Sequence, residues 1–163
     1  MSWTDFHQRQ QALAEVLDNA RRDLSAAFET VPGPFRDTDE LLAALHHKWM
    51  LQLNGRVEVA LTDTENAPHG DRVEAVTTAW RRTARDNPGL RAALDVHADN
   101  PALREPTARE HRLLAIAAGL AEEHEPSHDA ARVGRAFVQL LRAAPDADRH
   151  ARQGRLRKLI PSF

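Results

Sequence analysis

The nine histidines of this sequence are its most versatile side chains, because imidazole binds metals and exchanges protons near neutral pH. His46 and His47 are adjacent, so they point to different faces of a helix. His124 and His128 have the spacing of two zinc ligands, but Pro126 lies between them and places them in a loop or at a helix start. We therefore expect solvated histidines, with no metal site and no cofactor.

Sequence motifs for catalysis are missing. There is no HExxH segment, no Ser-His-Asp pattern and no glycine-rich phosphate loop. The chain has no cysteine, which excludes a thiolate nucleophile, a thiolate metal site and a disulfide framework. Its carboxylates are scattered over polar helix faces. These features predict a protein that is not an enzyme, and a small helical enzyme with a histidine or carboxylate site is the alternative.

Two tryptophans lie on the apolar faces of consecutive helical segments. They suit either the wall of a cavity for a small apolar ligand or an ordinary packed core, and both interpretations stay open. A few polar side chains nearby would orient such a ligand. The predicted ligand-binding residues are Trp49, Gln52, Arg56, Trp80 and His111.

Positive charge gathers near the C-terminus. Five of the 22 Lys and Arg residues lie in 149–158, which leaves 17 against 24 Asp and Glu elsewhere. Such an acidic body binds nucleic acid poorly, so DNA binding is doubtful unless the tail contributes. The tail's apolar residues instead suit docking on the body. The candidate phosphate contacts are Arg152, Arg155, Arg157 and Lys158.

The elements that position these residues are helices. Strong helix formers dominate, tyrosine is absent and strand-like alternation is missing, so we expect an all-α fold of six or seven helices. The 163 residues suit one domain over 1–145, followed by a basic tail over 146–163. We expect a cytoplasmic protein, because no apolar stretch suits a signal peptide or a membrane span and cysteine is absent.

Capping residues and breakers predict where these helices begin and end. We expect an N-terminal helix within 1–32, from the capping signal at Ser2 to the break before Val31. Pro106 is expected to interrupt a helix that opens at residue 101, and Thr107 with Glu110 to restart it as a capping box. The other helices are expected over about 37–61, 71–86, 88–98, 107–121 and 129–144.

Several segments resemble regulators of the TetR/AcrR-like family. The segment FRDTDELL at 35–42 resembles the opening of that family's fourth helix. Helices in the ligand-binding half of actinobacterial members resemble the segments AWRR at 79–82, NPGLR at 87–91, REHRLL at 109–114 and AGL at 118–120. The resemblance covers roughly 33–143. It implies a TetR ligand-binding-domain-like bundle in 37–145 that forms homodimers and binds a small apolar effector.

The sequence is too short for the DNA-binding helices of that family. Only 18 positions separate Leu17 from Phe35, too few for a helix-turn-helix. Thr38 stands where the family usually has lysine. The resemblance therefore implies a regulatory domain without normal DNA reading, and none of the family's DNA contacts carries over. A DNA-binding regulator with an atypical reader or a basic tail remains the alternative.

The two late helices predict a dimer interface. Stretches 107–121 and 129–144 are expected to pair with their copies in a four-helix bundle, because one layer leaves an apolar face uncovered. The predicted dimerisation residues are Leu113, Ile116, Leu120, Val133, Phe137 and Leu140.

Overall fold

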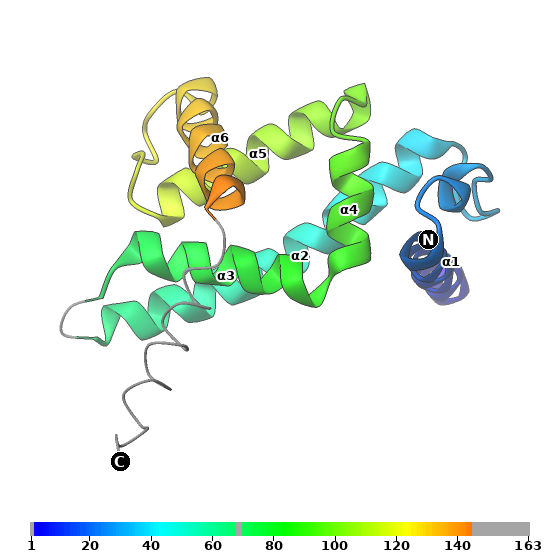
Figure 1. The fold of residues 1–163 in the computed structure, drawn as a ribbon, viewed down its shortest axis with the longest axis horizontal. Helices are drawn as coiled ribbons and strands as arrows, with labels where there is room; N and C mark the ends of the chain where they lie inside the picture. The colour runs from blue at the N-terminus through cyan, green and yellow to red at the C-terminus, as the bar shows by residue number, and fades with distance from the viewer. Residues whose placement is uncertain (1, 68–69, 145–163) are drawn as a thin grey trace, which may run out of the picture.

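The computed structural model describes residues 2–67 and 70–144, and within these ranges the chain forms six α-helices, one short 3-10 helix and no strand (Figure 1). The all-α expectation is confirmed. The elements are α1 (Trp3–Arg22), η1 (Ala26–Phe28), α2 (Thr38–Glu65), α3 (Arg72–Asp86), α4 (Pro88–Val96), α5 (Pro101–Ala117) and α6 (Ser127–Ala143).

Helix α2 is the spine of the molecule. The Asp37 side chain caps it by accepting a hydrogen bond from the Glu40 backbone N–H at 2.8 Å. Its apolar stripe is buried against α3 on one side and α5 on the other, while α4 runs between these two helices (Figure 1). The stripe residues that are wholly buried are Leu41, Leu42, Leu45, Trp49 and Leu53.

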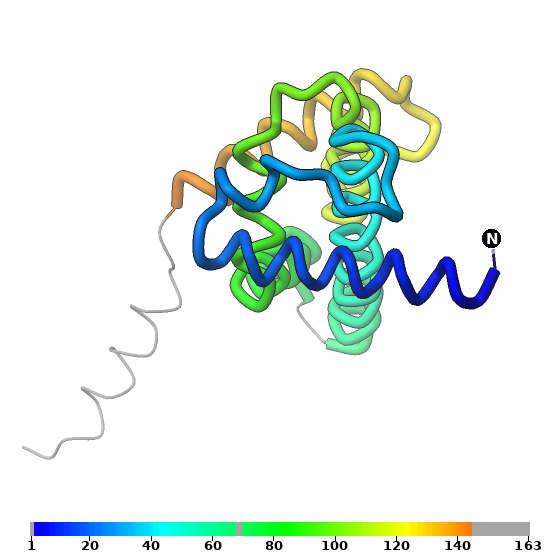
Figure 2. The backbone as a smooth tube through the Cα atoms, turned by 90° about the vertical axis from the view of Figure 1, so that its right-hand side faces the viewer, coloured from blue at the N-terminus to red at the C-terminus, as the bar shows by residue number. Residues whose placement is uncertain are grey.

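Helix α1 ends earlier than expected. It stops at Arg22, and η1 follows instead of a continued helix. The Asp23 side chain accepts hydrogen bonds from the backbone N–H groups of Ser25 and Ala26, which offers the chain a turn in place of another helical turn. The N-terminal half of α1 extends beyond the other helices (Figure 2).

Helix α5 is continuous, so the predicted break at Pro106 was wrong. Asn100 caps the helix by accepting from the Ala102 N–H at 2.8 Å, and Leu103 in the first turn is buried. Proline removes the backbone donor of one residue only, close to the helix start. The capping and burial of the first turn explain why the helix continues. Thr107 therefore begins no new helix.

Helices α5 and α6 cross closely. Gly134 of α6 lies against the backbone of His111 in α5, and a side-chain carbon at residue 134 would collide with the His111 carbonyl group. Glycine is required here for this close approach. The crossing sets the distance between the polar side chains that both helices present on one side.

None of the helices in the described ranges combines the length and the apolar character that crossing a bilayer demands.

Candidate functional site

A buried carboxylate is the centre of the candidate site. Glu110 of α5 is 3% exposed, yet it lies deep in an otherwise apolar interior. Its Oε2 is 3.1 Å from Nε2 of His46, and its Oε1 accepts a hydrogen bond from Nε1 of Trp49 at 3.0 Å. His46 and Trp49 are three positions apart on α2, so one helical face presents both to the carboxylate.

Glu110 is ionised in this environment. Burial alone raises its pKa, but the hydrogen bonds from His46 and Trp49 and the positive charge of Arg91 outweigh burial, so the pKa lies below the ordinary value. Because a carboxylate only accepts hydrogen bonds, the His46 Nε2 must carry a proton and donate. The histidine is thereby held in one orientation.

Arg91 of α4 connects this network to the surface. Its Nη1 is 4.0 Å from Glu110 Oε1, and its guanidinium carbon lies 4.7 Å from the centre of the Trp49 ring. Its Nη2 also forms an ion pair with Asp95 at 2.8 Å. Asp95 contacts Arg142 of α6 at 2.9 Å as well. Charged groups therefore tie α4, α5 and α6 together.

An open cleft of about 490 Å³ lies beside this network, between α4, α5 and α6. On α6, Arg135, Val138 and Arg142 face it at spacings of three and four. On α5, Arg104 and His111 face it, two helical turns apart. The polar side chains in its lining are His46, Arg91, Asp99, Asn100, Arg104, Thr107, His111, Arg135, Gln139 and Arg142.

His111 is in a positive environment within this cleft. Burial lowers its pKa most, and Arg135, Arg142 and Arg91 lower the pKa further, while the Glu110 carboxylate opposes the shift. The net shift is downward from 6.5, so the imidazole is mostly neutral at pH 7. A neutral imidazole can both donate and accept a hydrogen bond.

The residues predicted to bind a ligand do not meet in one cavity. Trp49 and Trp80 pack edge to face, with ring centres 6.0 Å apart, and both are buried in the main core. Gln52 lines a groove between α1 and α2. Arg56 pairs with Asp86 at 2.7 Å, and His111 lies in the arginine-lined cleft.

The predicted dimerisation residues divide between three environments. Leu113 and Ile116 line a groove of about 590 Å³ between α2, α3 and α5. Val133 is partly buried, and Phe137 is only 7% exposed within the chain's own core. The prediction that Phe137 lies on an uncovered face was therefore wrong. Leu120 and Leu140 are exposed.

Two sequence expectations about polar residues also need correction. His46 is buried rather than solvated, and the Glu110 side chain binds His46 and Trp49 instead of closing a capping box. The sequence does contain an indication that Glu110 is buried. Glu110 occupies an apolar stripe position between Leu103 and Leu114, where a polar residue needs a buried partner.

Arg152, Arg155, Arg157 and Lys158 lie outside the described residues, as does the rest of the predicted tail. Within the described ranges, no group of three or more His, Asp or Glu side chains is placed to hold a metal ion. Comparisons with family models, with curated proteins and with solved structures found no match.

Proposed function

We propose that this chain is a non-enzymatic regulatory domain that binds a small effector molecule in the cleft between α4, α5 and α6. The observation that carries the proposal is the cleft itself, whose volume of about 490 Å³ lies in the range of small-molecule sites. Polar side chains from the four helices α2, α4, α5 and α6 line it. The resemblance of segments 35–42 and 109–120 to TetR-like effector domains supports the regulatory part of the proposal.

The effector belongs in this cleft rather than at the tryptophans. Trp49 and Trp80 fill the core against each other, and the Trp49 N–H is already bound to Glu110. An apolar compound at that position would have to displace packed side chains, which is unfavourable in a close-packed interior. The cleft, in contrast, is open to solvent and needs no such displacement.

Native mass spectrometry of freshly purified protein tests the proposal without assuming the ligand's chemistry. We expect a bound small molecule that Ala108→Trp removes, because Ala108 lines the cleft and an indole there occupies the space. Ala43→Trp, on an exposed face of α2, is the matched control and should retain the molecule. A bare chain, together with no saturable binding in a broad compound screen, would contradict the proposal.

An enzyme is the second candidate, because a histidine held by a buried carboxylate is a common arrangement for a general base. His46 lines the cleft while Glu110 holds its Nε2, which leaves Nδ1 for proton transfer. A screen with ester, amide and phosphate-ester substrates decides between an effector-binding domain and an enzyme. Turnover lost in His46→Gln but retained in His47→Gln would favour the enzyme.

A further inference from the structure

Two arginines at the cleft have no acidic partner among the residues that the structure describes. Arg104 of α5 and Arg135 of α6 are exposed, and neither forms an ion pair with a carboxylate in the described part of the chain. Arg91 and Arg142 are balanced by two carboxylates, since both pair with Asp95 and Arg91 also lies 4.0 Å from Glu110. Asp99 is the one acidic residue among the described residues that line the cleft, against the two unpaired arginines. The cleft wall therefore has an excess of positive charge.

We infer that the cleft binds an organic oxyanion, such as a phosphate monoester or a polycarboxylate, through Arg104 and Arg135. This inference rests on the proposed effector site and specifies its ligand. Guanidinium groups bind phosphate and carboxylate oxygens with paired hydrogen bonds, and charge strengthens each bond. Thr107 and Gln139 line the same cleft and offer neutral hydrogen-bonding groups. The cleft volume of about 490 Å³ is larger than a phosphate group needs, so it leaves room for the organic part of the ligand.

Binding of such an anion should be coupled to protonation of His111. The charged groups that act on this imidazole are Glu110 on α5, Arg135 and Arg142 on α6, and Arg91 on α4. His46 of α2 is bound to Glu110, and Arg104 and Asp99 line the same cleft. A bound anion near these arginines offsets the repulsion between their positive charges and a protonated His111. The imidazolium is then stabilised, so the pKa of His111 rises on binding, and the affinity for an anion whose own charge is constant in this range increases as pH falls towards 6.

Phenyl phosphate and phenol are a matched pair of probes, because they differ in the anionic group. Isothermal titration should show saturable binding of phenyl phosphate and binding of phenol at least about tenfold weaker. Added salt should weaken the phosphate complex. Arg104→Gln and Arg135→Gln should each reduce affinity about tenfold, since each removes a charged hydrogen-bond donor.

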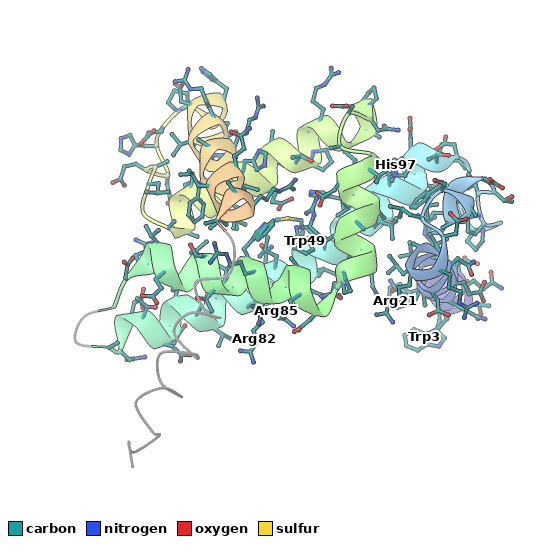
Figure 3. The ribbon with its side chains drawn as sticks, viewed as in Figure 1. Trp3, Arg21, Trp49, Arg82, Arg85 and His97 are labelled. Carbon is teal, nitrogen blue, oxygen red and sulfur yellow. The ribbon has the colours of Figure 1, made fainter. Side chains whose placement is uncertain are left out.

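Arg82→Gln is the matched control for these two variants. Arg82 is exposed on α3 and points away from α4, α5 and α6 (Figure 3), so its replacement should leave affinity unchanged. NMR titration of the imidazole signals gives a second readout. Phenyl phosphate should raise the pKa of His111 and leave the chemical shifts of His47, on the exposed side of α2, unchanged.

The outcomes separate the inference from the function it rests on. A neutral molecule that Ala108→Trp displaces and that Arg104→Gln does not affect would overturn the oxyanion and keep the effector site. Failure of every small molecule to bind would overturn both. Duplex DNA that binds more tightly than phenyl phosphate, through Arg104 and Arg135, would identify a nucleic-acid surface and overturn the inference.

Discussion

At the scale of single residues, Glu110 connects the core to the cleft. Its two carboxylate oxygens bind different side chains of α2, and the charge of Arg91 lies 4.0 Å away. A buried charge is unfavourable without such partners, whereas removing one member of a paired set leaves the others unsatisfied. Glu110 therefore fixes the orientations of His46 and Trp49 and influences the charge state of His111.

Replacing Glu110 by glutamine should destabilise the fold by about 3 kcal/mol. Glutamine keeps one acceptor oxygen for the two donors His46 and Trp49, and Arg91 loses the nearby negative charge. Urea unfolding measures this as a lower midpoint with an unchanged slope. Glu105→Gln on the same helix is the control, since the exposed Glu105 makes only a 3.6 Å surface pair with Arg109. That variant should change stability by less than about 0.5 kcal/mol. Equal effects of both variants would contradict the role of Glu110.

The same carboxylate predicts a pH dependence of stability. The folded-state pKa of Glu110 lies below its ordinary value of 4.5, so its stabilising contribution is present above pH 4.5 and is lost as pH falls through the folded value. The pKa of His111 is also lowered in the folded state, so protonation of this imidazole below pH 6.5 likewise reduces the stability of the fold. Unfolding free energies measured from pH 7 to pH 3 should therefore show the wild type approaching Glu110→Gln at the acidic end. A constant difference between them would show that Glu110 does not titrate as inferred.

The tryptophans should behave as core residues. Trp49→Ala and Trp80→Ala should each destabilise the fold by about 3–5 kcal/mol, because each indole is buried against the other. Trp3→Ala is the control, since Trp3 is 76% exposed and its loss should have little effect. Denaturant unfolding of the three variants provides the comparison. A small effect at Trp49 would indicate a cavity wall instead of a packed core.

At the scale of elements, the crossing of α5 and α6 positions the cleft. Both helices contribute arginines to it, and Gly134 allows their backbones to approach at His111. Arg72 of α3 also donates hydrogen bonds to the carbonyl groups of Ile116 and Ala117, which holds the C-terminal end of α5. The cleft geometry therefore depends on contacts that lie outside it.

Gly134→Ala should destabilise the protein by more than about 2 kcal/mol, because the new methyl group meets backbone atoms that cannot rotate away. Gly55→Ala in α2 is the matched control. A methyl group there meets nothing within 4 Å. Alanine should then stabilise the helix by roughly 0.5–1 kcal/mol through its higher helix propensity. Thermal unfolding compares the two, and equal midpoints would show that the crossing tolerates a side chain.

At the scale of the whole molecule, the proposed homodimer now depends on the outer surface of the late helices. Leu140 of α6 is 69% exposed and Leu120 is 42% exposed. Phe137, which was expected at the same interface, already packs in the core. Leu140 remains the strongest candidate for an apolar contact between two copies.

Sedimentation equilibrium at micromolar concentration should give about twice the monomer mass of 18.2 kDa. Leu140→Glu should shift the equilibrium towards monomer, because it places a charge in the proposed apolar contact. Val59→Glu is the control, since Val59 is 62% exposed on α2, outside the late helices. A monomeric wild-type protein across this concentration range would contradict the proposed dimer. If Leu140→Glu remains dimeric, the interface lies elsewhere on the molecule.

The sequence by itself determined the helical class and several helix starts. Ser2, Asp37, Asp71 and Asn100 cap the helices that follow them, since capping depends on atoms within three residues of the cap. The end of α1 was missed because the hydrogen bonds of the Asp23 turn outweighed the apolar periodicity. The continuity of α5 at Pro106 was missed because burial of its first turn outweighed the helix-breaking effect of proline.

Only the tertiary structure decided the candidate site. Glu110 binds residues 64 and 61 positions earlier in the chain, and the cleft arginines come from three helices. Spacing along one helix shows which residues share a face, as it does for Arg135 and Arg142. It does not show which face of another helix lies opposite, because that depends on crossing angles and close contacts such as Gly134 against His111.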